Sequence, residues 1–407
     1  MKNKKQPILR FSDYSDEWKT HVLRDVVERV TRKNKGLESQ LPLTISAQYG
    51  LVNQISYFNK QVASKDMSNY FLLKRGEFAY NKSYSRDYPW GAIKRLDKYD
   101  MGALSSLYIT FKPYQIDSNF LVSYYDTTKW HKEVSTRATE GARNHGLLNI
   151  SANDFLDTEI FIPSQKEQEK IGSFFKQIDE AIALQQQELD ILKQTKQGFL
   201  QKMFPREGES VPEIRFSNFE GEWKRYAWKD TVDISTNMVD PKSGEYDHLL
   251  HVGPGNIESF TGRILNNVKS VKEDNLISGK FHFKAGDVIY GKINPQLGKC
   301  ALPNFEGLAS ADSYVLNTKE DLTQEFLFRL LQGQSFYKYS VSVSRRTGMP
   351  KINRDELNQY EFLIPSTLEQ KKISNFFNKL DKSIELHEKE LEALKETKKA
   401  FLQKMFV

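Results

Sequence analysis

Residues 163–204 read PSQKEQEKIGSFFKQIDEAIALQQQELDILKQTKQGFLQKMF, and this stretch predicts one long helix. Its apolar residues recur at steps of three, four and seven, which indicates a continuous apolar stripe. Ser164 followed by Glu167 fits a capping box, in which each side chain bonds a free backbone N–H of the first turn. At 1.5 Å per residue the helix would be roughly 60 Å long. The stripe comprises Ile171, Phe174, Phe175, Ile178, Ile182, Leu189 and Leu192.

The same pattern returns 202 positions later, in residues 365–406. The capping pair recurs as Ser366 and Glu369. Two helices of this length favour pairing with each other, because each would outrun a single domain. The alternative is that each helix covers the surface of its own domain. The second stripe comprises Ile373, Phe376, Phe377, Leu380, Ile384, Leu391 and Leu394.

Both stripes are broken near the middle by a polar residue, Gln185 in the first helix and His387 in the second. An antiparallel pair related by a pseudo-twofold axis would bring these two residues close together. Polar residues in such a seam often fix the register at some cost in stability. The sequence therefore predicts an antiparallel, coiled-coil-like spacer whose interface includes Gln185 and His387.

A shorter segment, the leader, occurs ahead of each helix. Ile8–Phe11 followed by Glu17–Lys19 recurs as Glu213–Phe216 followed by Glu222–Lys224. The chain is thus leader, globular domain and helix, and then the same three parts again. If this order repeats about a pseudo-twofold axis, the C-terminal Phe406 should lie near the first leader. The predicted parts are a first domain at 1–162, a central helix at 163–204, a second domain at 205–365 and a C-terminal helix at 366–407.

Both globular parts are predicted to be strand-rich α+β domains. Residues 76–82 and 286–292 each read as a turn into a half-buried strand that ends in a polar loop. An apolar helix then begins near Phe120 or Phe326, and a basic loop containing glycine follows it. The fold class is therefore α+β, with two similar domains and two long antiparallel helices.

Composition narrows the class of protein. With 407 residues the chain is long enough for two domains, and 39% hydrophobic and 28% charged residues are ordinary for a globular protein. No apolar run is long enough for a membrane span, and no secretory signal follows the N-terminal lysines. A single cysteine, Cys300, fits a reducing cytoplasm.

The net charge of +6 mildly favours a polyanionic partner, and it is unevenly shared. Residues 1–162 hold 24 Lys and Arg against 18 Asp and Glu, whereas residues 205–365 hold 20 against 22. If both domains bind the same polyanion, the second domain must use a local patch.

Catalytic and metal-binding signatures are lacking in the sequence. Gly253-Pro254-Gly255 has neither the lysine nor the following helix of a phosphate-binding loop. Asn294-Pro295-Gln296 fails to complete the Asn/Asp-Pro-Pro-aromatic motif expected of a methyltransferase that acts on an exocyclic amine. We therefore expect no catalytic residues, no metal and no cofactor in this chain.

Polar and basic loops occur at the same place in both halves and combine side chains that read base edges and grip phosphates. Taken alone, such loops are more often solvated surface turns than binding sites. Their recurrence beside the start of each long helix makes binding as good an interpretation as a solvated turn. The candidate DNA-binding residues are Asn81, Lys82, Tyr84, Arg86, Arg137, Arg143, Asn144 and His145 in the first half, and Lys292, Asn294, Gln296, Lys299, Arg345, Arg346 and Lys351 in the second.

The whole chain resembles the specificity subunits of type I restriction–modification systems (HsdS type). The resemblance rests on the double IPS-x-x-EQ junction at Ile162–Gln168 and Ile364–Gln370, the paired FLQKMF ends and the divergent globular halves. It implies two target-recognition domains that each read one half of a split, asymmetric site in double-stranded DNA.

The resemblance also implies the partners. Two methyltransferase subunits would dock on the paired helices, and two restriction subunits would attach through them. S-adenosylmethionine, ATP and Mg²⁺ would belong to those subunits and not to this chain. The alternative function is a non-catalytic protein–protein scaffold with two binding domains on a helical spacer.

Overall fold

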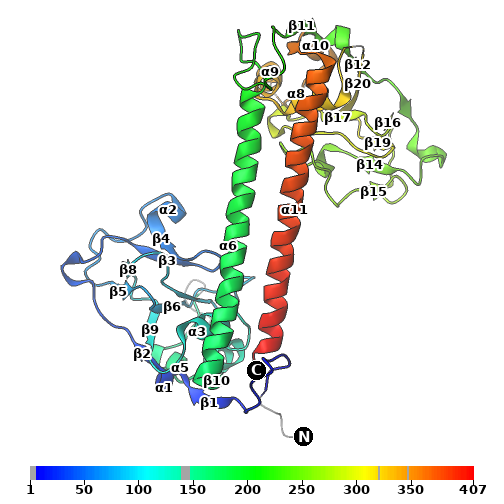
Figure 1. Ribbon diagram of the computed structural model, residues 1–407. Helices are drawn as coiled ribbons and strands as arrows, with labels where there is room; N and C mark the ends of the chain where they lie inside the picture. Colours follow the sequence, from blue (N-terminus) through cyan, green and yellow to red (C-terminus); the bar gives the residue numbers. More distant parts are fainter. Residues whose placement is uncertain (1–5, 139–146, 320, 346–347) are drawn as a thin grey trace. The chain divides into compact units, whose positions relative to one another are not determined.

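The computed structural model describes residues 6–138, 147–319, 321–345 and 348–407, and its contacts group the chain into two compact units (Figure 1). Unit 1 comprises residues 1–186 and 389–407, and unit 2 comprises residues 187–388. The borders between the units fall within the two long helices, whereas the predicted domain borders fall at the ends of these helices. The predicted domain borders stay predictions.

The two predicted long helices are confirmed. Helix α6 spans Gln165–Lys202 and helix α11 spans Thr367–Met405, with no break in either. Their lengths of 38 and 39 residues correspond to roughly 57 Å each at 1.5 Å per residue.

Within each unit, α6 and α11 run antiparallel. In unit 1 the rings of Phe174 and Phe401 lie 5.2 Å apart, and Gln185 Nε2 donates to Glu390 Oε2 at 2.9 Å. In unit 2 the rings of Phe199 and Phe376 lie 4.9 Å apart, and His387 Nδ1 lies 3.8 Å from Glu188 Oε2. Numbers rise along α6 as they fall along α11, and each contact in one unit is the 202-residue image of a contact in the other. The proximity of Gln185 to His387 stays a prediction.

The stripes of both helices serve two purposes at once. All sixteen residues of the predicted interface are buried or half-buried. Ile171 and Phe175 also belong to the main core of unit 1, as Ile373 and Phe377 do to that of unit 2. The two interpretations of the stripe therefore both hold, because each helix pairs with the other and covers its own domain.

Unit 1 is built on a four-stranded antiparallel sheet in the order β2-β9-β6-β7. The pairs β1–β10, β3–β4 and β5–β8 form separate antiparallel ribbons. The strands are β1 (Lys19–Val22), β2 (Val27–Arg29), β3 (Leu43–Ser46), β4 (Gly50–Asn53), β5 (Phe71–Lys74), β6 (Phe78–Asn81), β7 (Ala92–Arg95), β8 (Met101–Leu104), β9 (Ile109–Pro113) and β10 (Glu159–Ile162). The helices are α1 (Leu23–Val26), α2 (Gln54–Phe58), α3 (Ser118–Tyr125), α4 (His131–Arg137) and α5 (Ala152–Leu156).

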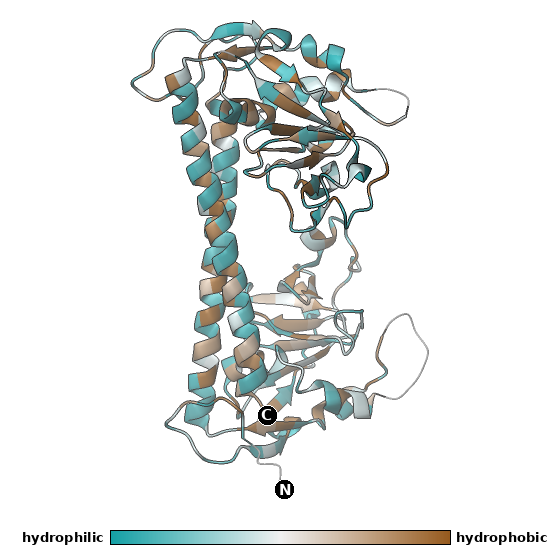
Figure 2. Cartoon of the chain, turned by 90° about the vertical axis from the view of Figure 1, so that its right-hand side faces the viewer, coloured by the Kyte–Doolittle hydropathy of each residue, from teal (hydrophilic) through white to brown (hydrophobic). Residues whose placement is uncertain are grey.

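Unit 2 repeats the four-stranded sheet in the order β12-β20-β17-β18 and adds a five-stranded sheet in the order β13-β16-β19-β14-β15. The strands are β11 (Lys224–Ala227), β12 (Val232–Ile234), β13 (Met238–Val239), β14 (Leu250–Val252), β15 (Lys269–Ser270), β16 (Lys280–Phe283), β17 (Val288–Gly291), β18 (Cys300–Ala301), β19 (Gly307–Ala309), β20 (Ser313–Thr318) and β21 (Glu361–Ile364). The helices are α7 (Trp228–Thr231), α8 (Gln324–Gln332), α9 (Gln334–Val343) and α10 (Arg354–Asn358). In Figure 2 the strands are mostly brown, whereas α6 and α11 mix brown and teal.

The double IPS-x-x-EQ junction ties leader, domain and helix together. The Glu167 carboxylate accepts two bonds of 2.7 Å from Arg10 of the leader, which differs from the expected capping box. Gln168 Oε1 accepts from the backbone N–H of Asp117, the N-cap of α3, at 2.9 Å. Unit 2 repeats this with Arg215 on Glu369, and with Gln370 on Thr323, the N-cap of α8. A buried carboxylate recruits a cation more strongly than it recruits a backbone N–H, so the arginine takes the glutamate's part of the box. In unit 2 the serine's part remains, because Ser366 Oγ accepts from the Glu369 N–H at 3.4 Å.

The end of each long helix lies against the leader of its own unit. In unit 1, Leu9 N–H donates to Lys404 O at 2.9 Å, and the rings of Trp18 and Phe406 lie 6.0 Å apart. In unit 2, Ile214 N–H donates to Lys202 O at 2.9 Å, and Phe204 and Trp223 repeat the ring contact at 6.0 Å. The predicted proximity of Phe406 to the first leader is therefore confirmed.

Candidate nucleic-acid interface

In unit 2 the two predicted DNA-binding loops lie side by side. Ile293 pairs with Lys351 in an isolated antiparallel bridge. Ile352 N–H donates to Lys292 O at 3.0 Å, and Asn294 N–H donates to Pro350 O at 2.8 Å. These backbone bonds bring the loop after β17 and the basic loop before α10 into one surface.

Unit 1 uses the same construction. Ser83 pairs with Leu147, and Leu148 N–H donates to Lys82 O at 2.9 Å. The loop after β6 and the segment that ends the first basic loop are therefore joined as in unit 2. The ammonium of Lys82 donates to Ile150 O at 3.3 Å, so this lysine also supports the joint.

The remaining candidates of unit 1 have different surroundings. Tyr84 and Arg86 are exposed on the loop after β6, whereas Asn81 is half-buried and accepts from Ser83 N–H at 3.0 Å. Arg137 was predicted to begin a loop, but it is the last residue of α4 and pairs with Glu133 at 2.6 Å. The four-residue spacing to Glu133 on a helix explains that pairing. The candidates Arg143, Asn144 and His145 lie outside the described residues.

The candidates of unit 2 sit on a short, constrained loop. Asn294 has a left-handed backbone (φ 53°) and is followed by the 3₁₀ turn Pro295–Leu297. Gln296 is exposed, and its Nε2 donates to Asn294 Oδ1 at 3.3 Å. Lys299 donates to Pro254 O, and Arg345 is exposed. The candidate Arg346 lies outside the described residues.

Two residues of this surface were missed by sequence reasoning. Arg354 and Tyr314 lie beside Lys292, with the Arg354 guanidinium carbon 5.7 Å and the Lys292 Nζ 5.1 Å from the centroid of the Tyr314 ring. Arg354 follows Asn353, the N-cap of α10, so its sequence context suggested only a helix start. Tyr314 lies in an apolar strand and gave no signal at all.

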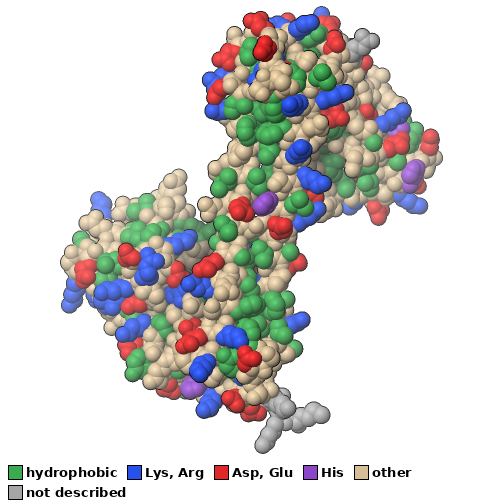
Figure 3. Space-filling model, in the orientation of Figure 1, with side chains coloured by type: hydrophobic (Ala, Val, Ile, Leu, Met, Phe, Trp, Pro, Cys, Tyr) green, Lys and Arg blue, Asp and Glu red, His purple; other side chains and the backbone are tan. Residues whose placement is uncertain are grey.

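The space-filling view shows Lys and Arg side chains spread over the globular part of unit 1, among fewer acidic ones (Figure 3). This agrees with the positive balance of residues 1–162. Unit 2 carries a more even mixture, so its basic residues matter by their position and not by their number.

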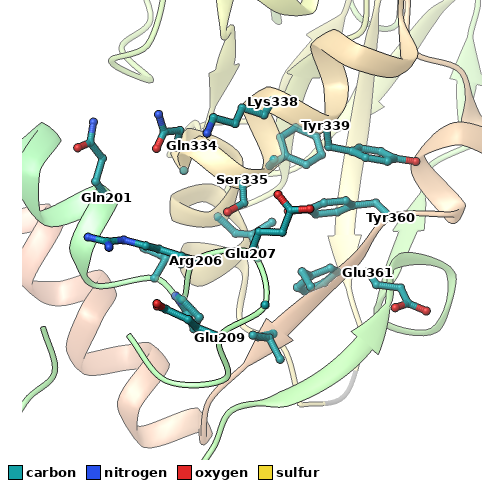
Figure 4. Close-up of a pocket in the computed structure, with 18 of the residues that line it drawn as sticks. Gln201, Arg206, Glu207, Glu209, Gln334, Ser335, Lys338, Tyr339, Tyr360 and Glu361 are labelled. Atoms are coloured by element: carbon teal, nitrogen blue, oxygen red, sulfur yellow. The ribbon is translucent and has the colours of Figure 1, made fainter. Parts of the chain in front are cut away.

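A cavity of about 830 Å³ lies elsewhere in unit 2, between the end of α6, residues 205–209, α9 and β21 (Figure 4). Arg206, Glu207 and Glu209 come from the segment after α6, and Gln334, Ser335 and Lys338 come from α9. None of the candidate DNA-binding residues lines it. Its wall mixes acidic and basic side chains and shows no preference for one kind of ligand.

Within the described ranges, no three His, Cys, Asp or Glu side chains gather in a way that could hold a metal ion. Among those same residues, no helix combines the length and the apolar character needed to cross a membrane.

Comparison with known sequences assigns the family. The sequence model of the type I restriction modification DNA specificity domain matches residues 16–194 and, a second time, residues 220–396. The chain belongs to this family. The two matches follow the internal repeat, and each contains one leader tryptophan, one set of candidate loops and most of one long helix.

Curated relatives are specificity subunits. The chain is similar to the type I restriction enzyme EcoDI specificity subunit of Escherichia coli, with 29% identity over 262 residues that cover 58% of each chain. It is also similar to the MjaVIII specificity subunit of Methanocaldococcus jannaschii, with 22% identity over 63% of each. The chain thus matches less than two thirds of the length of either relative.

Solved structures share the fold. The type I restriction–modification S subunit from M. genitalium aligns over 99% of both chains with a TM-score of 0.60 and 15% identity. A chain from a structure of type I R-M complex assembly and conformational transition aligns over 96% of this chain and 97% of that one, with a TM-score of 0.54 and 15% identity.

Proposed function

We propose that this chain is the DNA-specificity subunit of a type I restriction–modification complex and that it reads an asymmetric, bipartite duplex site. Residues 1–162 and 205–365 would be the two recognition domains, with the α6–α11 pair as the spacer. The observation that carries the proposal is that the two units share one scaffold but carry different loops. The junction, the leader contact and the helix pairing recur in both units, whereas the candidate loop residues differ, apart from the shared lysine at Lys82 and Lys292.

The two loops present different side chains on the same framework. Asn81, Lys82, Tyr84 and Arg86 stand in unit 1 where Gly291, Lys292, Asn294 and Gln296 stand in or near the matching loop of unit 2. Different donors and acceptors on the same framework read different base edges. Two such surfaces on one chain would read two different half-sequences.

The partners follow from the same proposal. Two methyltransferase subunits would bind this chain and two restriction subunits would join through them, in the cytoplasm where the DNA lies. S-adenosylmethionine, ATP and Mg²⁺ would be bound by those subunits. This chain would contribute recognition and positioning but no catalytic group.

The test is to co-express the full chain with a type I methyltransferase subunit and to map methylated positions across a genome. We expect one bipartite motif with two unlike halves and a fixed gap. The variant Asn294→Ala with Gln296→Ala should relax one half only, and Tyr84→Ala with Arg86→Ala should relax the other half only.

The matched control is Lys319→Ala, which removes a lysine of unit 2 that pairs with Asp233 at 3.0 Å. It should leave the motif unchanged. A contiguous motif, or loop variants that relax both halves alike, would contradict the proposal. Complex formation without any sequence-dependent methylation would favour the protein–protein scaffold.

A further inference from the structure

Three cationic residues of unit 2 lie on neighbouring segments: Lys292 and Arg354 share the ring of Tyr314, and Lys351 pairs with Ile293, the residue after Lys292. Lys292 is the first residue after β17. Lys351 lies shortly before α10, and Arg354 is the first residue of α10. Within the part of the chain that the structure describes, no carboxylate lies within ion-pairing distance of any of the three. This is unlike Arg10, Arg215 and Lys398, each of which binds a carboxylate.

Backbone and aromatic contacts hold the cluster in place. The bridge between Ile293 and Lys351 fixes the spacing of the two loops. Arg354 donates to Ile234 O and Ser235 O at 3.0 Å each, which anchors its guanidinium. Tyr314 lies beneath Lys292 and Arg354, and its hydroxyl donates to Ile352 O at 3.3 Å. The site is therefore arranged before any ligand arrives.

In the free protein the positive charges of this cluster repel one another. Burial lowers the pKa of Lys292, the charge of Lys351 lowers it further, the carboxylate of Asp312 opposes this, and the charge of Arg354 adds a smaller lowering. Like charges held together in a fixed frame cost stability, and such an arrangement is typical of a functional site. An anion placed between the three cations would remove the repulsion.

We propose that Lys292, Lys351 and Arg354 form a phosphate anchor that grips one or two backbone phosphates of the bound duplex. This rests on the proposed function and assigns these residues to the DNA backbone. Asn294 and Gln296, on the turn that follows Lys292, are left to face the base edges. Phosphate contacts fix register and carry no sequence information by themselves, so the anchor would position the base-reading loop.

Among the residues that the structure describes, unit 1 has no equivalent of this anchor. In the matching register of unit 1, Ile109 opposite Tyr80 takes the place of Tyr314 opposite Tyr290. Leu147, opposite Ser83, takes the place of Lys351. Unit 1 keeps one of the cations, Lys82, and its ammonium already bonds Ile150 O. A local anchor explains how a half with slightly more acidic than basic residues can grip a polyanion.

The experiment measures binding of the full chain to a 40-base-pair duplex of arbitrary sequence at several salt concentrations. Each phosphate contact contributes about 0.9 to the slope of log K against log salt. Lys292→Ala with Lys351→Ala should lower the slope by about 1–2. Between 50 and 200 mM salt, two lost contacts make the variant lose roughly tenfold less affinity than the unaltered chain.

Three controls separate the outcomes. Lys319→Ala should leave the salt slope unchanged, because this lysine is not part of the anchor. Lys292→Arg, with Lys351 intact, should keep most of the slope, because the anchor retains its charge. The methylation map of the assembled complex should keep both half-sequences.

An unchanged slope in the double variant would overturn the anchor. A changed second half-sequence would show that these lysines read bases and would overturn it as well. In each of those cases the unaltered chain still binds DNA, so the proposed function would stand. An unaltered chain that binds no duplex would overturn both.

Discussion

The guanidinium of Arg10 binds both carboxylate oxygens of Glu167, at 2.7 Å each, although the two residues are 157 positions apart. The Glu167 side chain is fully buried and that of Arg10 is 12% exposed. Glu167→Gln keeps the shape but leaves a cation without its counter-charge. We expect the free energy of unfolding to fall by about 3 kcal/mol, the lower end for breaking a buried pair, because Arg10 retains some water. Urea unfolding measures it.

The matched control joins the same two segments in solvent. Lys170 of α6 binds Asp13 of the leader at 2.8 Å, with side chains 42% and 67% exposed. Exposed pairs of this kind contribute little, because water already solvates both charges. Asp13→Asn should therefore leave the unfolding curve nearly unchanged. Equal losses from the two variants would contradict the burial argument.

A second prediction concerns pH and the buried carboxylate of Asp126. Burial raises the pKa of Asp126, but the nearby ammonium groups of Lys94 and Lys398, each at 2.8 Å, outweigh it and hold the pKa below its ordinary value. A carboxylate with a lowered folded-state pKa stabilises the fold above its unfolded-state pKa of about 3.9. Asp126→Asn should cost about 3 kcal/mol at pH 7. The difference from the unaltered chain should shrink as the pH falls towards 3.

Asp179 supplies the contrasting variant in the same cluster. It binds Lys398 at 2.7 Å, but burial outweighs that charge and raises the pKa of Asp179. Its charged form is thus disfavoured in the fold, so stability from this group grows as the pH falls through its pKa. Asp179→Asn should cost less than Asp126→Asn at pH 7, and its difference from the unaltered chain should grow at lower pH. Parallel pH profiles would refute the assignment.

A third prediction follows from the leader contacts. Lys202 and Ile214, which share a backbone bond, are twelve positions apart. Fusing Val407 directly to Met1 would put the same twelve positions between Lys404 and Leu9, which share the equivalent bond. A circular permutant opened between Arg206 and Gly208 should therefore fold with a Tm near that of the unaltered chain and bind DNA alike.

The control for the permutant is a chain opened within α6, between Glu188 and Leu189, which cuts the helix and the contact of Glu188 with His387. It should unfold at a markedly lower temperature. If both permutants behave alike, the repeated leader contact does not hold the chain together.

The sequence was informative wherever a feature is periodic or repeated. The stripe of Phe174 and Ile178 predicted α6, and its 202-residue copy predicted α11 and the antiparallel pairing. The five-stranded sheet of unit 2 was not predicted, because strands of two to four residues such as β13 and β15 are too short to show alternation. Partners far apart in the chain were also missed. Nothing local distinguishes Glu167, which binds Arg10, from a capping residue.

The candidate site also has residues that the sequence could predict and residues that it could not. Lys292 and Lys351 could be singled out because their loops recur in both halves. The placement of Lys292 and Arg354 on Tyr314 depends on contacts such as the backbone bond from Ile352 to Lys292, 60 positions apart, which no spacing rule supplies. Arg137 was misplaced because a helix end and a loop start differ by a single residue.

A fourth prediction concerns Arg345, which is exposed at the start of the second basic loop. Replacing Arg345 and Arg346 with Ala should weaken DNA binding of the assembled complex. If either arginine binds a guanine with two hydrogen bonds, the loss is about 1–3 kcal/mol and one half-sequence relaxes. If they contact phosphates instead, binding to all sequences weakens and the salt slope falls. Unchanged affinity and slope would mean that the pair is a solvated turn.

The last prediction concerns the spacer, on the premise that helix length sets the gap between the half-sites. Repeating Glu188–Ile191 once in α6 adds four residues, or about 6 Å of rise. Four residues nearly preserve the stripe, since a turn takes 3.6. We expect the same two half-sequences with a gap longer by one or two base pairs, because only one helix of the pair is lengthened and the mismatch must be absorbed.

A matching repeat of residues 390–393 in α11 sharpens the test. In each unit alone, α6 and α11 are paired in a fixed antiparallel register, as Gln185 with Glu390 and His387 with Glu188 show. An insertion after Ile191 shifts the later part of α6 by four residues, and an insertion after residue 393 lets α11 shift by the same amount. The pairing at both ends of the helix pair is then restored. The ten residues of α6 between the two insertion points shift along α11 by about one turn. The double insertion should lengthen the gap by roughly two base pairs, at about 3.4 Å each, and with higher activity than the single one. A methylation map with altered half-sequences, or with an unchanged gap in both variants, would refute the premise.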